Sequence, residues 1–252
     1  MKKERVISIL IHGASKAGKS TVTSTAPLPL LVIDAEGSWK FIREQGFRSG
    51  IPLRKKTWDP LEPPPRHDGT WDVAYVSIDS WESIQRVVGW LSSGQHDFVS
   101  IVLDSITELQ RRLKTNISGD GVVKGYDGWG AVLARMDQLI RGIRDLTINA
   151  YQPVCCVIFI AETVERNGKW RPYMQGQIAT SLPYWVDLCG YLYQSREADE
   201  NGNMTRKVVN LFIGSHDQFE SGERVQGLLP DNIINPNVSG MLDTIYPEEV
   251  KA

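Results

Sequence analysis

Short apolar runs alternate along the chain with longer segments in which apolar residues recur at helical spacing. Continuous apolar runs are typical of strands buried on both faces of a parallel sheet, and the recurring pattern is typical of amphipathic helices. The strand-like runs are 5–13, 29–37, 73–79, 98–105 and 153–163. The helical segments are 80–93 and 127–150. This order predicts an α/β protein with a mostly parallel sheet covered by helices on both faces.

The pattern changes after residue 180. Segments 186–196 and 205–214 flank a polar stretch with Asn201-Gly202, which predicts an antiparallel hairpin added to one edge of the sheet. Residues 49–72 form a proline-rich excursion on the surface. We expect one domain over 1–252, with a core at about 5–220. The extension at about 221–252 would wrap the surface or meet a neighbouring subunit.

Composition limits the classes of protein that fit. The 252 residues include 28 Lys and Arg against 30 Asp and Glu, so the formal net charge is −2, and binding to nucleic acid would need a local basic patch. Cys155, Cys156 and Cys189 lie in apolar runs, which indicates buried free thiols rather than a disulfide framework. No apolar run approaches about 20 residues, and the first residues lack a small-residue cleavage site. We therefore expect a soluble cytoplasmic protein without a membrane partner.

Residues 13–20 read GASKAGKS and fit the phosphate-loop pattern G-x-x-x-x-G-K-[ST]. The glycines allow a tight turn whose backbone N–H groups converge on phosphate oxygens. Lys19 would reach the β- and γ-phosphates, and the Ser20 hydroxyl would ligate Mg²⁺. The alternative is a plain strand-to-helix turn with an exposed lysine. The apolar strand directly before Gly13 favours the interpretation as a nucleotide-binding loop. The residues expected to bind it are Gly13, Ala14, Ser15, Lys16, Ala17, Gly18, Lys19, Ser20 and Thr21.

Two further strands end in acidic residues. Asp104 closes the run SIVLD and could hold magnesium partly through its water shell, while a helix N-cap is a compatible alternative role. Asp34 and Glu36 close the run LLVIDAEG, at an edge where sites form in such sheets. Glu36 could polarise a water for attack on the γ-phosphate, or it could be part of an acidic turn before Gly37.

The ordered set of phosphate loop, IDAEG, IVLDSITEL, long helix, VIFIAE and terminal hairpin resembles the RecA-like recombinase ATPase core over about residues 5–220. It is most similar to the compact bacteriophage-encoded RecA-like annealing and recombination ATPases, which implies the host cytoplasm as the location. The resemblance implies ATP and Mg²⁺ as cofactors. It also implies catalytic roles for Lys19 and Glu36, with Asp104 as the magnesium acid. Glu162 occupies the sensor position, where the family usually has glutamine.

The same resemblance implies self-association into a ring or filament, with nucleotide near the protomer interface. Two features of the family have no counterpart here. Its N-terminal oligomerisation segment has no room before the first core strand, and its paired lysines have only Arg206, Lys207 and His216 as nearby substitutes.

RecA-like proteins hold single-stranded DNA on two loops, which correspond here to 110–130 and 165–177. Basic and aromatic residues are interleaved in both, which suits phosphate pairing and base stacking. The residues expected to bind DNA are Arg111, Arg112, Lys114, Lys124, Arg166, Lys169, Trp170, Arg171 and Tyr173. Two alternatives stay open: Arg111 and Arg112 as the solvated face of a helix, and the second loop as a simple hairpin with its turn at Asn167-Gly168-Lys169 and with Trp170 covering a neighbour's surface.

These residues predict a DNA-stimulated ATPase that promotes annealing or strand exchange. A nucleotide-gated annealing module with little hydrolysis is an alternative from a different class. A helicase-type motor would use the same core but normally brings a further domain. A phosphoryl-transfer kinase would need a lid and an acceptor pocket, and the sequence places neither.

Overall fold

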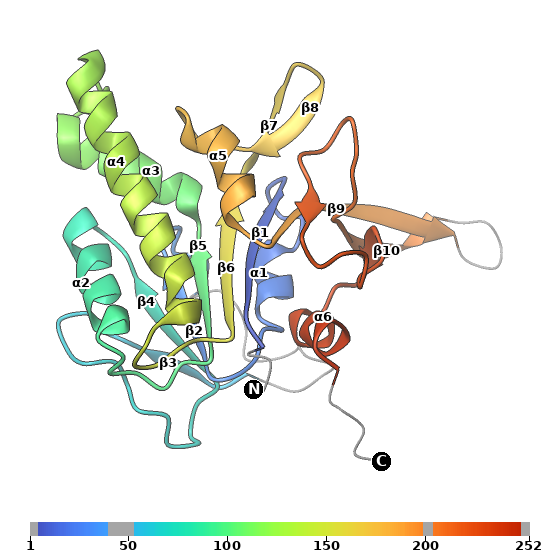
Figure 1. The fold of residues 1–252 in the computed structure, drawn as a ribbon, viewed down its shortest axis with the longest axis horizontal. Coiled ribbons are helices and arrows are strands. Elements are labelled where there is room, and N and C mark those ends of the chain that lie inside the picture. Colours follow the sequence, from blue (N-terminus) through green and yellow to red (C-terminus); the bar gives the residue numbers. More distant parts are fainter. Residues whose placement is uncertain (1–4, 40–52, 199–203, 248–252) are drawn as a thin grey trace.

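The computed structural model describes residues 5–39, 53–198 and 204–247, shown as a coloured ribbon in Figure 1. The strands are β1 (Ile7–Gly13), β2 (Leu30–Asp34), β3 (Lys55–Thr57), β4 (Val73–Ser77), β5 (Ser100–Asp104), β6 (Cys156–Ala161), β7 (Thr163–Arg166), β8 (Lys169–Pro172), β9 (Leu188–Ala198), β10 (Met204–Phe212), β11 (Gly222–Glu223) and β12 (Asn232–Ile234). The helices are α1 (Lys19–Thr23), α2 (Trp81–Ser92), α3 (Ile106–Ser118), α4 (Gly125–Arg144), the 3₁₀ helix η2 (Asp145–Ile148), α5 (Ile178–Trp185) and α6 (Val238–Ile245).

One sheet organises the molecule, with strand order β12-β10-β9-β1-β6-β5-β2-β4-β3. The strands from β9 to β3 are parallel to their neighbours, and β10, β11 and β12 are antiparallel additions. The predicted fold class is confirmed. The expected hairpin is corrected in one respect: β9 pairs in parallel with β1, so the antiparallel part begins with β10. The turn with Asn201-Gly202 lies outside the described residues.

Helices cover both faces of the sheet, as Figure 1 shows. Along β2, Leu31 and Ile33 join the apolar cluster under α2, α3, α4 and α5, while Leu30 and Val32 join the cluster that includes α1 and α6. All four side chains are fully buried. Burial of each contributes about 1.5–3 kcal/mol, which explains why a run without polar positions is required here.

The proline-rich excursion is tied to the sheet. The pattern of polar and apolar residues did not predict β3, which pairs with β4 at the far edge. Trp58 and Trp71 are buried in the core at either side of the excursion. Arg54 binds the Asp72 carboxylate through two nitrogens, at 2.7 and 3.0 Å, and closes the base of the segment.

Residues 221–247 pack against the sheet and against the end of α1. β11 pairs with β9, and β12 pairs with β10. The backbone N–H of Val238, at the start of α6, donates to Thr25 Oγ1 at 2.8 Å, just after α1. The C-terminal segment therefore completes the cover of the face that carries α1.

Candidate nucleotide site

The phosphate loop connects the end of β1 to α1. Lys16 and Gly18 adopt left-handed backbone conformations, with φ of 61° and 106°. At Gly13, a side-chain Cβ would lie 2.3 Å from the carbonyl oxygen of Leu192 on β9. The side-chain amide of Gln194 donates to the carbonyls of Lys16 and Ala17, at 3.2 Å each, and supports the loop from β9.

Lys19 lies folded over its own loop. Its Nζ donates to the carbonyl oxygens of Gly13 and Ala14, both at 2.9 Å. Burial lowers the pKa of Lys19, while the charges of Glu36, Asp104 and Glu162 act in the opposite direction. Lys19 is thus a partly desolvated cation near three carboxylates, held by two carbonyl oxygens. Such a cation is suited to exchange these carbonyl oxygens for phosphate oxygens when a phosphate binds.

Ser20 and Asp104 meet across the end of the sheet. The Ser20 hydroxyl donates to Asp104 Oδ2 at 2.9 Å, and the indole Nε1 of Trp39 donates to the same oxygen at 2.9 Å. Burial raises the pKa of Asp104 to about 6; the charges of Glu36 and Asp34 add to the rise, and the two hydrogen bonds oppose it.

The donors at this point fit magnesium, because a hydroxyl and a carboxylate are the hard oxygen ligands that it prefers. Within residues 5–39, 53–198 and 204–247, no cluster of three or more His, Cys, Asp or Glu could hold a metal. Magnesium here would therefore depend on phosphate oxygens and water as well as on Ser20 and Asp104.

Asp34 holds the turn that follows β2. Its carboxylate accepts hydrogen bonds from the backbone N–H groups of Gly37, Ser38 and Trp39, at 2.8 to 3.2 Å. Burial raises the pKa of Asp34, and these backbone hydrogen bonds counteract that rise. Asp34 therefore has a structural role, and the turn that it holds carries Glu36.

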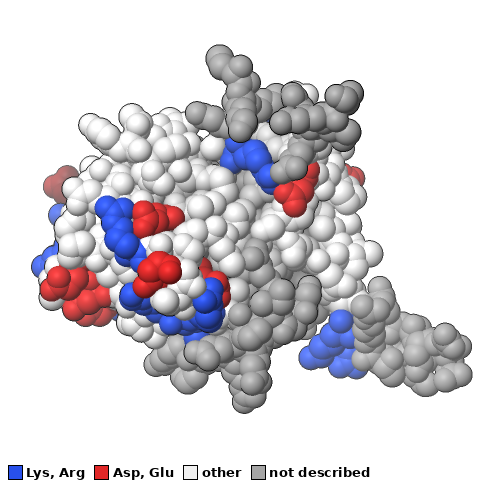
Figure 2. All heavy atoms as spheres, turned by 90° about the horizontal axis from the view of Figure 1, so that it is seen from below, with Lys and Arg blue, Asp and Glu red and all other residues white. Residues whose placement is uncertain are grey.

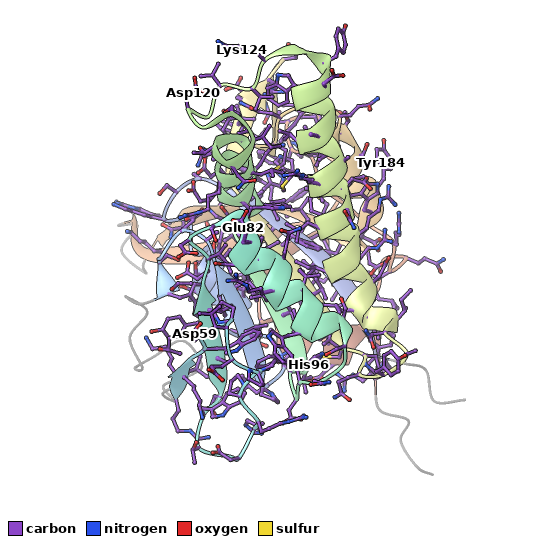
Figure 3. All side chains as sticks on the ribbon, turned by 90° about the vertical axis from the view of Figure 1, so that its left-hand side faces the viewer. Asp59, Glu82, His96, Asp120, Lys124 and Tyr184 are labelled. Carbon is purple, nitrogen blue, oxygen red and sulfur yellow. The ribbon has the colours of Figure 1, made fainter. Side chains whose placement is uncertain are left out.

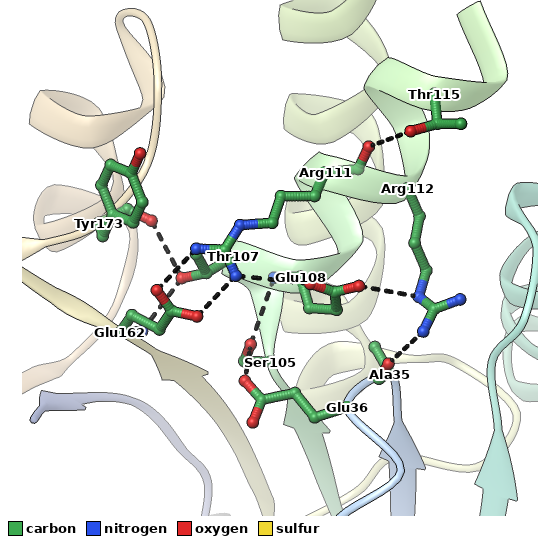
Figure 4. A network of polar contacts seen from close by, with 10 residues as sticks. All are labelled: Ala35, Glu36, Ser105, Thr107, Glu108, Arg111, Arg112, Thr115, Glu162 and Tyr173. Atoms are coloured by element: carbon green, nitrogen blue, oxygen red, sulfur yellow. Dashed lines mark hydrogen bonds and ion pairs between the residues drawn. The ribbon is translucent and has the colours of Figure 1, made fainter. Parts of the chain in front are cut away.

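Glu36 reaches the start of α3. Its Oε1 accepts a hydrogen bond from the Ser105 hydroxyl at 2.5 Å, as Figure 4 shows. Ser105 is also the N-cap of α3, because its Oγ accepts from the backbone N–H of Glu108. The cap is therefore Ser105 rather than Asp104. Glu36 does form part of an acidic turn, but its carboxylate points to the same strand ends as Asp104.

Glu162, directly after β6, pairs with Arg111 of α3. Two guanidinium nitrogens donate to the two carboxylate oxygens at 2.6 and 2.7 Å (Figure 4). This hydrogen-bonded pairing lowers the pKa of Glu162 and raises that of Arg111. The main chain of Glu162 donates to Thr107 Oγ1 and accepts from the N–H of Tyr173. Glu162 thus joins the strand end to α3 and to the segment after β8.

Arg112, on α3, supports the turn that follows β2. Its guanidinium donates to the carbonyls of Ala35, at 2.7 Å, and Asp79, at 3.1 Å. Ala35 immediately precedes Glu36, so Arg112 braces the turn that carries this carboxylate. Two of its guanidinium nitrogens are thus engaged by main-chain carbonyls, and the phosphate contact expected from the sequence stays a prediction.

The two segments predicted as DNA loops are more ordered than expected. Residues 110–118 belong to α3, so the true connection before α4 is short, and Lys124 lies at the tip of the α3–α4 pair (Figure 3). Arg111, Lys114 and Tyr173 line a common cavity of about 130 Å³. The rest of its lining is Thr107, Gln110 and Gln175.

The second segment is the hairpin β7–β8, as its alternative interpretation predicted. Asn167 and Gly168 form the turn, with φ of 53° and 74°. Trp170 is half-buried; its main chain bonds to Gln218 and Glu220 at 2.8 Å each. Its ring stacks near Tyr191, with centroids 6.5 Å apart. The hairpin is therefore packed on its own chain, and Trp170 contributes to that packing.

Of the remaining residues predicted to contact DNA, two lie near a carboxylate and two are exposed to solvent. Lys169 and Arg171 face the Glu220 carboxylate at 3.5 and 3.7 Å, whereas Arg166 and Lys124 are exposed. On the face seen in Figure 2, which lies away from the β7–β8 hairpin, basic and acidic side chains are intermixed.

Sequence reasoning missed three side chains that organise this site: Trp39, Ser105 and Thr107. Each directly follows or lies near an acidic strand end, but the residue that it contacts is far away in the chain. His12, at the end of β1, is fully buried and contacts Thr163 Oγ1 and the carbonyl of Glu220.

In the part of the chain that the structure describes, no helix has the length and apolar character needed to cross a membrane. A family model described as AAA domain matches residues 5–225. No curated protein matches the chain.

Proposed function

The chain belongs to the AAA domain family. We propose that it is a magnesium-dependent ATPase that acts on single-stranded DNA in annealing or recombination. The observation that carries the ATPase part is the convergence of Lys19, the Ser20–Asp104 pair and the Ser105–Glu36 pair at one edge of the sheet. This edge holds the phosphate loop and the carboxyl ends of the parallel strands, where ligands bind in open α/β sheets.

Each residue has a distinct task with ATP as substrate. Lys19 exchanges the carbonyls of Gly13 and Ala14 for oxygens of the β- and γ-phosphates, where charge develops during transfer. Ser20 and Asp104 hold Mg²⁺, which when bound neutralises charge on the same oxygens.

Glu36 accepts a hydrogen bond from a water and orients it toward the γ-phosphorus. The Ser105 hydroxyl fixes the Glu36 carboxylate for this task, at 2.5 Å.

The path from nucleotide to DNA runs through Glu162. Its carboxylate holds Arg111, and its carbonyl holds the N–H of Tyr173, so a change at the γ-phosphate that moves Glu162 reaches two walls of one cavity. Arg111, Lys114 and Tyr173 offer phosphate-binding cations and an aromatic ring, which is the chemistry that single strands require. Loss of Glu162 as a partner would free Arg111 for a phosphate.

Self-association is part of the proposal. Ala14, Ser15 and Lys16 are exposed on the phosphate loop, beside the β9–β10 hairpin that projects from the body (Figure 1). A nucleotide bound there would remain accessible to a second copy of the chain. Mass photometry with and without ATP and single-stranded DNA would detect assembly, and electron microscopy would separate a ring from a filament.

The deciding experiment measures ATP turnover with and without single-stranded DNA. The variants are Lys19→Ala and Glu36→Gln, with Arg86→Ala on the exposed face of α2 as a matched cation control. We expect stimulation by DNA in the unchanged protein and in the control. Both active-site variants should lose at least about 100-fold in turnover, because each removes a transition-state contact.

The alternatives give different results. Annealing that persists with a nonhydrolysable nucleotide or without nucleotide indicates the nucleotide-gated module. Duplex unwinding that requires turnover indicates the helicase-type motor. A protein that hydrolyses ATP but neither binds DNA nor responds to it would contradict the DNA part while leaving the ATPase part intact.

A further inference from the structure

Trp39 brings its indole to the carboxylate that is expected to hold magnesium. Its side chain is fully buried, and Nε1 donates to Asp104 Oδ2 at 2.9 Å. The Ser20 hydroxyl donates to the same oxygen at the same distance. Among the described residues, no hydrogen bond is made to the other oxygen, Oδ1. Two protein donors thus occupy one side of the carboxylate.

Trp39 is itself held in place from two directions. Its backbone N–H donates to Asp34 Oδ2 at 3.1 Å. Asp34 and Asp104 are register partners at the ends of neighbouring strands β2 and β5. A single residue therefore connects both strand-end carboxylates, one through its main chain and one through its indole.

The indole is also fixed by packing. Trp39 belongs to the apolar cluster that contains Ala17 of the phosphate loop and Val22 of α1. A ring buried in this way loses contacts if it turns away from Asp104, so the N–H stays aimed at the carboxylate without reorganisation. A water molecule in the same place would not be restrained by such packing.

We propose that Trp39 is a positioning residue for the magnesium acid, an inference that rests on the proposed function. Its indole N–H holds Oδ2 beside Ser20 and leaves Oδ1 to accept from the water shell of the metal. Groups that orient a metal-binding carboxylate in this way typically change metal affinity by about 10–100-fold when they are removed. Trp39 acts through Asp104 and makes no contact with the reacting atoms.

The test replaces Trp39 by Phe, which retains a ring of similar shape and removes the N–H. Binding of a fluorescent ADP analogue is measured with saturating Mg²⁺ and again in EDTA, together with the Mg²⁺ concentration that gives half-maximal binding. We expect metal-free binding within about twofold of the unchanged protein, and a Mg²⁺ requirement raised by roughly 10-fold. In an Asp104→Asn background, Trp39→Phe should cause no further change in the Mg²⁺ requirement.

Trp81→Phe is the matched control. Trp81 is also buried, but its Nε1 has no hydrogen-bond partner among the described residues. Removing this N–H should leave the Mg²⁺ requirement unchanged. Thermal unfolding of each variant separates a loss of positioning from a loss of folded protein.

Several results would overturn the inference. Equal weakening of metal-free and Mg²⁺-supported binding would make the indole a packing group alone, and an unchanged Mg²⁺ requirement would do the same. If the unchanged protein binds nucleotide and Trp39→Phe has the same Mg²⁺ requirement, the inference is wrong while the proposed function stands. If the unchanged protein binds no nucleotide in either condition, both fall together.

A second measurement does not depend on the stability of Trp39→Phe. In protein with ¹⁵N-labelled tryptophan and bound ADP, the Trp39 indole N–H resonance should shift when Mg²⁺ is added, and the Trp81 resonance should not. A Trp39 indole resonance that does not shift when Mg²⁺ is added would contradict the proposal.

Discussion

Arg111 and Glu162 form a bidentate ion pair, and both side chains are about 40% exposed or more. Exposed pairs of this kind contribute at most about 1 kcal/mol to the free energy of unfolding. The value of the pair therefore lies in what it connects rather than in stability. It joins the end of β6 to the helix that lines the cavity beside Tyr173.

Glu162→Gln is the residue-scale test of that connection. The substitution keeps the size of the side chain and removes its charge, so Arg111 loses its bidentate partner whether or not nucleotide is bound and keeps only the longer contact with Glu108 at 3.4 Å. We expect unfolding to change by less than about 1 kcal/mol, and the ratio of single-stranded DNA affinities with ATP and ADP to approach one. Fluorescence anisotropy with a labelled oligonucleotide measures this ratio.

Asp137→Asn is the matched control for Glu162→Gln. Asp137 also accepts two hydrogen bonds from an arginine, Arg141, but this pair lies along α4. The control should keep the nucleotide dependence of DNA binding. If Glu162→Gln keeps it as well, Glu162 is not the coupling residue.

His12 makes the stability of the fold depend on pH. It is fully buried, contacts Thr163 Oγ1 at 3.1 Å, and donates to the carbonyl of Glu220 at 2.7 Å. Burial lowers the pKa of His12 to about 4, whereas the unfolded chain has the ordinary value of 6.5. The unfolded state therefore binds the proton first as pH falls.

The contribution of His12 to the free energy of unfolding should be fully retained above pH 6.5 and should decrease between pH 6.5 and 4. For His12 alone the loss reaches about 3 kcal/mol. Urea unfolding at several pH values measures it. His96 also has its pKa lowered to about 4 by burial, so the contribution of His12 is the difference between the unchanged protein and His12→Gln. Parallel curves for the two proteins would contradict this assignment.

At the scale of elements, the approach of β1 to β9 decides which residue can begin the phosphate loop. A Cβ at Gly13 would lie 2.3 Å from the Leu192 carbonyl oxygen, and backbone on both sides belongs to central strands. Gly13→Ala should cost roughly 1–3 kcal/mol in the free energy of unfolding and abolish nucleotide binding. Chemical unfolding and binding of a fluorescent nucleotide measure the two effects.

Gly89 provides the opposite case. It lies inside α2, and a Cβ there would have nothing within 4 Å. Gly89→Ala should stabilise the protein by about 0.5–1 kcal/mol, because alanine has the better helix propensity. If Gly13→Ala and Gly89→Ala change the free energy of unfolding in the same direction, close packing at Gly13 does not explain the effect of Gly13→Ala.

The elements also show what the sequence could predict and what it could not. The phosphate loop and the acids at 34, 36 and 104 were predictable, because carboxyl ends of parallel strands meet at one edge whatever the details of packing. The contacts of Ser105 with Glu36 and of Trp39 with Asp104 were not, since they join residues more than 60 positions apart. The start of the expected loop 110–130 belongs to α3, which agrees with the alternative that places Arg111 and Arg112 on the face of a helix. The sequence left this alternative open because basic residues suit both a solvated helix face and contact with phosphate.

At the scale of the whole molecule, a net charge of −2 means that the proposed binding of DNA would depend on a small group of cations. For single strands, the logarithm of the binding constant falls with the logarithm of salt concentration by about 0.7 for each phosphate contact. Lys114→Ala, at the cavity beside α3, should therefore reduce this slope by about 0.7. Titrations at several salt concentrations measure it, with Arg86→Ala on α2 as the control that keeps the original slope.

The place of β1 in the sheet has a consequence for the synthesis of the protein. This strand carries the phosphate loop, yet its two neighbours are β6 and β9, which begin at Cys156 and Leu188. At about 5–20 residues per second, a ribosome needs roughly 7–30 s after completing β1 to supply β6. A growing chain thus contains every residue of the phosphate loop well before β6 and β9 can pair with β1 and hold the loop in its folded position.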